Sequence, residues 1–290
     1  MLFSAILTGL VLGGTYALVA MGLTLQYGVA RIMNLAYGDV IIAASFGAFV
    51  LFTALGVNPL LGMLLVIPAG FALNWLIYAV MLQPLARRSR DRGRLEGDSI
   101  LATFGLLFVI QGVALVIFGA GFQSYSFLAV PVDVLGTTIA ANRLLAFALA
   151  LVFGLGLWLM LTRTRFGTVI RAVAANPASA PLVGIDVDSV ARFAFALGGA
   201  LAAAGGVVVS MYLTFSATMG VIFTMKALIV VIMGGVGNLM GALAAGLILG
   251  LVETLVASFI DPGLTLAATY LIFLAVLVVR PQGLFGKAAR

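Results

Sequence analysis

The sequence predicts an all-α integral membrane protein that crosses the bilayer about eight or nine times. Of its 290 residues 64% are apolar and 8% are charged, and its mean hydropathy is +1.27. An ordinary soluble domain has about 25% charged residues. The apolar runs reach the ~20 residues that a spanning helix needs, and they do not alternate as the strands of a membrane β-barrel do. We therefore expect a single transmembrane domain over residues 1–290.

Five spans are predicted in the first half of the chain. The first covers Phe3–Gln26, where no charge interrupts the apolar run. Residues 40–86 are long enough for two helices, and we divide them at Asn58-Pro59 because proline disfavours a helical conformation of the preceding residue. The fourth span runs from Ser99 to Gly119 and the fifth from Leu144 to Leu161. The Gly-, Ser- and Tyr-bearing segment between these two has the composition of an aqueous loop.

Four further spans follow in the second half, and their number depends on one glycine-rich turn. Candidate spans are Phe193–Leu213, Thr224–Gly241, Ala242–Phe259 and Leu264–Val279. The sequence G-G-V-G-N-L-M-G at Gly234–Gly241 is compatible with a tight hairpin or with a broken, re-entrant helix. A hairpin makes nine spans and a re-entrant helix makes eight.

Basic residues gather in three segments, the loops at 87–98 and 163–192 and the C-terminal tail. Lysine and arginine are enriched on the cytoplasmic side of membrane proteins, so these segments are expected inside the cell. Nine spans then place the C-terminus in the cytoplasm and the N-terminus outside. The net charge of +6 reflects this bias and does not indicate nucleic acid. The basic residues are Arg87, Arg88, Arg90, Arg92, Arg94, Arg163, Arg165, Arg171, Arg192, Arg280, Lys287 and Arg290.

A weak internal similarity relates the first span to the eighth. Gly9–Ala20 resembles Gly246–Ala257, and the nine-span arrangement makes these helices run in opposite directions. Inverted repeats are common in transporters. Chance similarity between helices that share small residues for close packing is the alternative.

Enzymatic chemistry is not indicated anywhere in the chain. Without histidine or cysteine, the sequence offers no imidazole or thiolate for a metal site or a nucleophile–base pair. The phosphate-binding pattern G-x-x-x-x-G-K-S/T is missing from the sequence, and the glycines at Gly235, Gly237 and Gly241 follow no predicted strand. We expect no ATP hydrolysis and no cofactor in this chain, so that any energy comes from a partner.

Three charged residues lie within predicted spans or at the end of one. Glu253 must face protein or water, as a group of the solute pathway or as a hydrogen-bond acceptor for a side chain such as Gln111 or Asn74. Asp39, with Arg31 and Asn34, is expected to form an interfacial ion pair at the cytoplasmic end of the second span. Lys226 is placed near the outer end of its helix, where its side chain extends to the interface.

Several motifs in order along the chain resemble one family of membrane proteins. These are Arg31-Ile-Met-Asn-Leu-Ala-Tyr-Gly-Asp39, Arg171-Ala-Val-Ala-Ala-Asn-Pro-Ala-Ser-Ala180 with Gly184-Ile185, Ala196-Leu-Gly-Gly-Ala200, and Lys226 leading to Gly234-Gly-Val-Gly and Glu253. Together they are similar to the LivH-type permeases, which are membrane subunits of ABC importers for branched-chain amino acids. Tyr37 departs from the family, which often has histidine there.

The resemblance implies a set of partners and two groups of functional residues. A second permease, two cytoplasmic ATPase subunits that use the ATP, and an extracytoplasmic solute-binding protein are implied, in a bacterial inner membrane. The implied ATPase contact contains a short helix with Asn176 as N-cap and Pro177 at the first helical position. Its residues are Arg171, Asn176, Pro177, Ala180, Gly184 and Ile185. Pathway or packing roles are assigned to Asn34, Tyr37, Asp39, Gly234, Gly235, Gly237 and Glu253.

The solute itself is not specified by the sequence. Few fixed charges lie along the spans, so selectivity is expected in the solute-binding protein. Urea, other amino acids, amides, small organic acids and sugars remain alternatives under the same mechanism. An ion-coupled secondary transporter is the alternative of another class, and it requires coupling-ion ligands in unwound helices.

Overall fold

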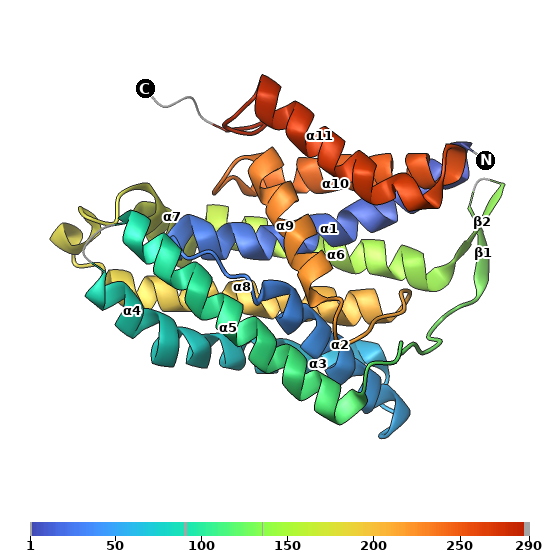
Figure 1. Cartoon of the computed structure of the whole chain (residues 1–290), viewed down its shortest axis with the longest axis horizontal. Helices are drawn as coiled ribbons and strands as arrows, with labels where there is room; N and C mark the ends of the chain where they lie inside the picture. Colours follow the sequence, from blue (N-terminus) through green and yellow to red (C-terminus); the bar gives the residue numbers. More distant parts are fainter. Residues whose placement is uncertain (1, 90–91, 135, 287–290) are drawn as a thin grey trace.

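The computed structural model describes residues 2–89, 92–134 and 136–286, which form an elongated bundle of helices (Figure 1). In that part of the chain seven helices are long and apolar enough to cross a membrane, and α2 (Tyr37–Thr53) and α9 (Gly220–Gly234) are shorter apolar helices. These helices lie at the positions of the predicted apolar segments, but two of them are shorter than a full span. The other helices are α1 (Leu2–Ala30), α3 (Pro59–Ile77), α4 (Gln83–Arg88), α5 (Arg92–Phe118), α6 (Ala141–Arg163), α7 (Arg165–Ala175), α8 (Val187–Ser210), α10 (Leu239–Phe259) and α11 (Thr265–Val279).

The predicted division at Asn58-Pro59 is confirmed. The Asn58 side chain accepts a hydrogen bond from the backbone N–H of Leu60 at 2.9 Å and thereby caps α3, and Pro59 occupies its first position. Proline fits there because the first N–H groups of a helix have no intrahelical partner. A π-helical turn over Tyr78–Leu82 joins α3 to α4, so that residues 59–88 form one long span.

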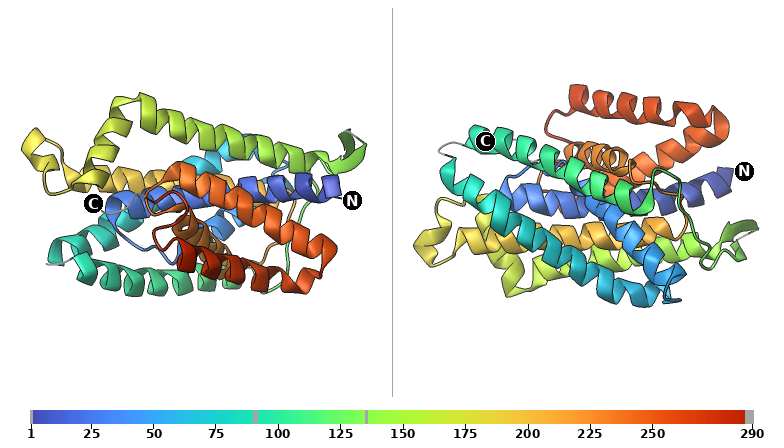
Figure 2. Two further views of the ribbon diagram at one scale, coloured as in Figure 1. Left: turned by 90° about the horizontal axis from the view of Figure 1, so that it is seen from above. Right: turned by 60° about the horizontal axis from the view of Figure 1, so that its bottom comes forward.

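Small residues bring the central helices into contact. In the most apolar stretch of α8, 89% of the residues are buried, whereas in that of the outer span ending in α11 only 6% are buried. α1 packs antiparallel to α10, with Gly9 against Leu251 and Gly13 against Leu247 (Figure 2). The opposite directions of these helices match the expectation. Close packing explains their shared glycines by itself, so the inverted repeat stays a prediction.

The basic segments and the N-terminus lie at opposite ends of the bundle (Figure 1). At one end are α4, the start of α5, α7 and the described tail, and at the other are the start of α1 and a hairpin of β1 (Pro131–Val134) and β2 (Thr137–Ala140). The hairpin is a small departure from the all-helical expectation. Arg90, Lys287 and Arg290 lie outside the described residues.

Both predicted basic loops contain more helix than expected. α5 begins at Arg92, so most of 87–98 is its first two turns. The segment 163–192 holds α7, a 3-10 turn over Ala180–Val183 and the first residues of α8. Short helices replace loop because each packs an apolar face against the bundle, as Ile170 and Val173 of α7 do.

The glycine-rich segment between α9 and α10 forms a hairpin turn. Gly235 and Gly237 adopt positive φ angles of 98° and 79°, which side chains disfavour. The C-terminal tail holds this turn, because the Leu284 N–H donates to the Met233 carbonyl at 2.7 Å and the Asn238 amide donates to the Phe285 carbonyl at 2.9 Å. Of the two predicted arrangements, the structure has the hairpin.

Candidate functional site

The second span begins inside the molecule. The chain leaves α1 at Arg31, whose φ is 57°, and runs without helix until α2 starts at Tyr37 (Figure 1). The fully buried Tyr37 hydroxyl donates to the Val19 carbonyl at 2.7 Å. Val19 lies about 16 Å along α1 from its end at Ala30, given a rise of 1.5 Å per residue. α2 therefore starts deep within the bundle.

Side chains from two other helices satisfy the non-helical backbone before α2, and a third helix holds the Asn34 side chain. The Thr103 hydroxyl of α5 accepts from the Leu35 N–H at 3.1 Å and lies 3.0 Å from the Met33 carbonyl. The Thr224 hydroxyl of α9 lies 3.1 Å from the Leu35 carbonyl, and the Asn34 amide donates to Gln26 at 3.1 Å. Non-helical backbone is tolerated at membrane depth when protein groups replace water as partners.

Asp39 lies in the first turn of α2, and its predicted ion pair is wrong. Asp39 is 2% exposed, and its Oδ2 atom has no hydrogen-bond partner among the described residues. The Arg31 guanidinium contacts the Ala174 carbonyl of α7 instead, at 3.4 Å. Because α2 starts deep inside, Asp39 is far from the interface where such a pair was expected. A Cβ atom on Gly220 would overlap the Asp39 carboxylate, so the carboxylate lies directly against the start of α9.

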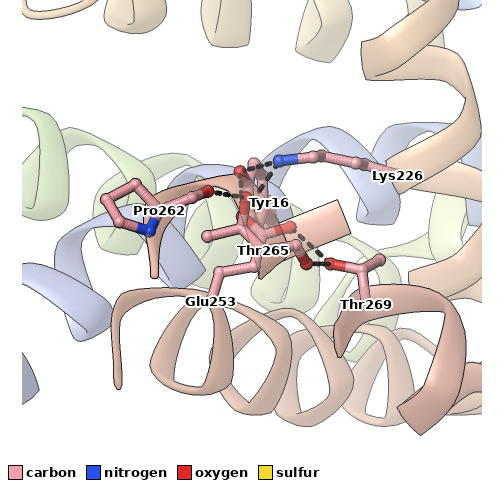
Figure 3. Close-up of polar contacts among 6 residues, drawn as sticks. All are labelled: Tyr16, Lys226, Glu253, Pro262, Thr265 and Thr269. Atoms are coloured by element: carbon pink, nitrogen blue, oxygen red, sulfur yellow. Dashed lines mark hydrogen bonds and ion pairs between the residues drawn. The ribbon is translucent and has the colours of Figure 1, made fainter. Parts of the chain in front are cut away.

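A second polar cluster joins four helices around Glu253 (Figure 3). Oε2 of Glu253 on α10 accepts from the Tyr16 hydroxyl of α1 at 2.7 Å and from the Lys226 ammonium of α9 at 2.9 Å. Oε1 accepts from the Thr269 hydroxyl of α11 at 2.7 Å. The Lys226 nitrogen also lies 4.7 Å from the centre of the Tyr16 ring. Both carboxylate oxygens are thus satisfied within the protein.

This cluster corrects two sequence-based predictions. Glu253 does accept interhelical hydrogen bonds, but neither Gln111 nor Asn74 donates them, and the Asn74 oxygen is 3.4 Å from the Gln26 amide instead. Lys226 does not extend to the interface, because an opposite charge inside the bundle binds it. The sequence held a usable signal: two opposite charges in otherwise uncharged spans are expected to pair, since each alone is costly in lipid.

The segment after α7 differs from the predicted capped helix. Asn176 follows the last residue of α7, and its side-chain oxygen accepts from the N–H groups of Ala178 and Ser179 at 3.1 and 3.2 Å. Asn176 therefore caps a turn, and Pro177 lies in that turn and does not begin an α-helix. A 3-10 turn follows and ends at Gly184, whose φ is 77°. The Asn–Pro pair stops α7 because proline disfavours a helical residue before it.

Exposed apolar and basic side chains make a surface at this end of the bundle. Leu182 is 86% and Val183 is 74% exposed, and Phe166 and Arg171 on α7 are exposed as well. We call Phe166, Arg171, Leu182 and Val183 the α7–α8 surface. Of the six residues predicted for the ATPase contact, Arg171, Asn176 and Gly184 are exposed, Pro177 and Ile185 are half-buried, and Ala180 is buried.

The connection from this surface to α8 is capped by Asp186. Its carboxylate accepts from the Asp188 N–H at 3.1 Å and from the Ser189 hydroxyl at 2.6 Å. The Ser189 hydrogen bond lowers the pKa of Asp186, which therefore stays ionised at the positive end of α8.

Comparisons with known proteins agree on one family. The model of the family described as branched-chain amino acid transport system / permease component matches residues 5–280. The high-affinity branched-chain amino acid transport system permease protein BraD of Pseudomonas aeruginosa is 27% identical, over 97% of this chain and 95% of its own length. A probable branched-chain amino acid transport permease protein LivH of Methanocaldococcus jannaschii is 30% identical, over 93% of this chain and 88% of its own.

A solved structure shares the fold at low sequence identity. It is that of PsaBC from Streptococcus pneumoniae in complex with Fab, matched with a TM-score of 0.53 and 14% identity. The match covers 97% of this chain and 92% of the other. At this identity the likeness concerns the fold alone.

Proposed function

Because the chain belongs to the family of permease components of branched-chain amino acid transport systems, we propose that it is a transmembrane subunit of an ABC importer for branched-chain amino acids. The family match over residues 5–280 is the observation that carries this proposal. In this role the chain provides a passage through the bilayer and does not select the solute or hydrolyse ATP. Its apolar interior, with few fixed charges, supports that division of labour.

The complete importer contains partners at both faces of the membrane. A second related permease pairs with this chain, two ATPase subunits bind at the cytoplasmic face, and a solute-binding protein delivers the amino acid from outside. The basic end of the bundle is cytoplasmic, which places the C-terminus inside and the N-terminus outside. The α7–α8 surface supports the ATPase contact, because exposed leucine and valine side chains beside an arginine form a typical protein interface.

A movement caused by docking at this surface can pass to the interior through the end of α1. Arg31 contacts the last turn of α7 through the Ala174 carbonyl and begins the non-helical segment that leads to α2. A displacement of α7 therefore acts on the backbone that positions Tyr37 and Asp39. This short path supports mechanical coupling between the ATPase subunits and the start of the second span.

The docking proposal is tested with Leu182→Asp and a matched control, Leu55→Asp. Leu55 is 67% exposed in the turn between α2 and α3, at the opposite end of the bundle. We expect Leu182→Asp to lose co-purifying ATPase subunits and ATP-driven uptake, while Leu55→Asp retains both. Full uptake by Leu182→Asp would show that the ATPase subunits do not bind at this surface.

The solute is tested in proteoliposomes that contain the complete importer and its binding protein. We expect ATP-dependent accumulation of leucine, isoleucine and valine. Accumulation of urea, an amide or a sugar in their place would leave the mechanism intact and change the solute. Uphill accumulation by this chain alone would instead show an ion-coupled transporter.

A further inference from the structure

We propose that the crossing of α2 and α9 at Asp39 binds a cationic group, and that this group is the primary ammonium of the transported amino acid. The inference rests on the proposed function, which supplies a substrate that carries an ammonium group. It assigns a pathway role to Asp39 and leaves Glu253 as a packing residue.

The two buried carboxylates of the spans differ in their partners. Glu253 receives three hydrogen bonds, one of them from the Lys226 ammonium, so both its oxygens have partners and its charge is compensated within the protein. Asp39 is equally buried, yet its Oδ2 atom meets no donor within residues 2–89, 92–134 and 136–286. A buried carboxyl group without a counter-charge is costly as an anion and takes up a proton, unless a cation lies beside it and compensates the charge.

Other oxygen atoms lie at the same crossing of α2 and α9. The Thr224 hydroxyl accepts from the Gly38 N–H at 2.8 Å and lies within 3.2 Å of the Leu35 and Gly220 carbonyls. Gly38 and Gly220 face each other so closely that a Cβ on Gly38 would overlap the Gly220 carbonyl. An ammonium group has three N–H donors and needs several acceptors, and a carboxylate with nearby carbonyl and hydroxyl oxygens matches that requirement.

The position of the crossing suits a transport site. α2 and α9 are the two apolar helices shorter than a full span, and each begins at this point inside the bundle. Transporters commonly bind solutes where helices are broken near the middle of the membrane. The residue after Asp39, Val40, lines a separate apolar cavity of about 290 Å³ whose other walls come from α2, α3 and α8.

The first experiment compares Asp39→Asn with Asp133→Asn in the complete reconstituted importer. Asn keeps the size of the side chain and removes its charge, and Asp133 is an exposed aspartate of β1. We expect Asp39→Asn to assemble and to bind the loaded binding protein, but to lose at least tenfold in leucine uptake. Asp133→Asn should behave as wild type. Leucine uptake by Asp39→Asn at the wild-type rate would overturn the inference.

The second experiment needs no variant and so does not depend on how Asp39→Asn folds. Dicyclohexylcarbodiimide, an apolar reagent that modifies carboxyl groups within membranes, is applied to the wild-type importer, and the product at Asp39 is measured by mass spectrometry. We expect leucine, delivered by the binding protein during turnover, to reduce the modification of Asp39. Protection by Na⁺ or K⁺ without any effect of leucine would assign the site to an alkali cation and overturn the ammonium assignment.

Failure of the two proposals can be told apart. Wild-type uptake of branched-chain amino acids reports on the proposed function, whereas the ratio between Asp39→Asn and wild type reports on the site. Normal leucine uptake by wild type, with no protection of Asp39 by leucine, would refute the site and leave the proposed function standing.

Discussion

Replacing Lys226 by methionine tests whether the ion pair with Glu253 stabilises the bundle. The substitution keeps an unbranched apolar side chain and leaves the Glu253 carboxylate with two hydroxyl donors, from Tyr16 and Thr269, and no cation. The Lys226 side chain is 17% exposed and the Glu253 side chain is 5% exposed, so the energetics of a buried ion pair apply. Removing one partner of a buried pair costs about 3–5 kcal/mol, because the other charge remains uncompensated.

The melting temperature should report this cost. For 290 residues the entropy of unfolding is about 0.6 kcal/mol per kelvin, so a loss of 3–5 kcal/mol lowers the melting temperature by about 5–8 °C. The purified protein is heated in detergent, and unfolding is followed by the fluorescence of its two tryptophans. Lys226→Met and Glu253→Gln should each melt lower than wild type.

The double variant Lys226→Met/Glu253→Gln decides the interpretation. It removes both charges of the pair, so it should melt higher than either single variant and retain uptake, as a packing role requires. A double variant that loses the sum of the two single effects would show that the charges do not stabilise each other. Normal stability of the double variant with complete loss of uptake would assign the pair to the solute pathway.

Two further substitutions probe the start of α2. Gly220→Ala places a methyl group against the Asp39 carboxylate and should cost about 1–3 kcal/mol of stability through overpacking. Gly105→Ala is the control, because a Cβ atom at Gly105 meets no atom within 4 Å. Equal melting temperatures of the two variants would contradict the close crossing of α2 and α9. Tyr37→Phe removes the hydrogen bond to the Val19 carbonyl and should cost about 1 kcal/mol in chemical denaturation. Tyr270→Phe changes an exposed tyrosine and should be neutral, so an equal effect of both would argue against the buried hydrogen bond.

Local chemistry allowed the sequence to predict the spans but not the depth at which they begin. The cap at Asn58-Pro59 depends on neighbouring residues, and the structure confirms it. The position of Asp39, only eight residues after Arg31, predicts that it lies at the interface. In the structure the intervening backbone runs into the bundle without forming helix, and the Thr103 and Thr224 hydroxyls that make this possible come from distant helices. No local pattern contains that information.

The sequence by itself determined the membrane class, the positions of the apolar helices and the clustering of basic residues, because lipid demands long apolar helices and the cytoplasmic side favours lysine and arginine. The tertiary structure decided which buried charges have partners. Glu253 and Lys226 are 27 residues apart in sequence and meet through the packing of α9 and α10, while Asp39 at the start of α2 remains without a cation among the described residues. The pairing of charges is a property of the assembled helices, since the cost of a buried charge depends on which side chains the fold brings within hydrogen-bond distance.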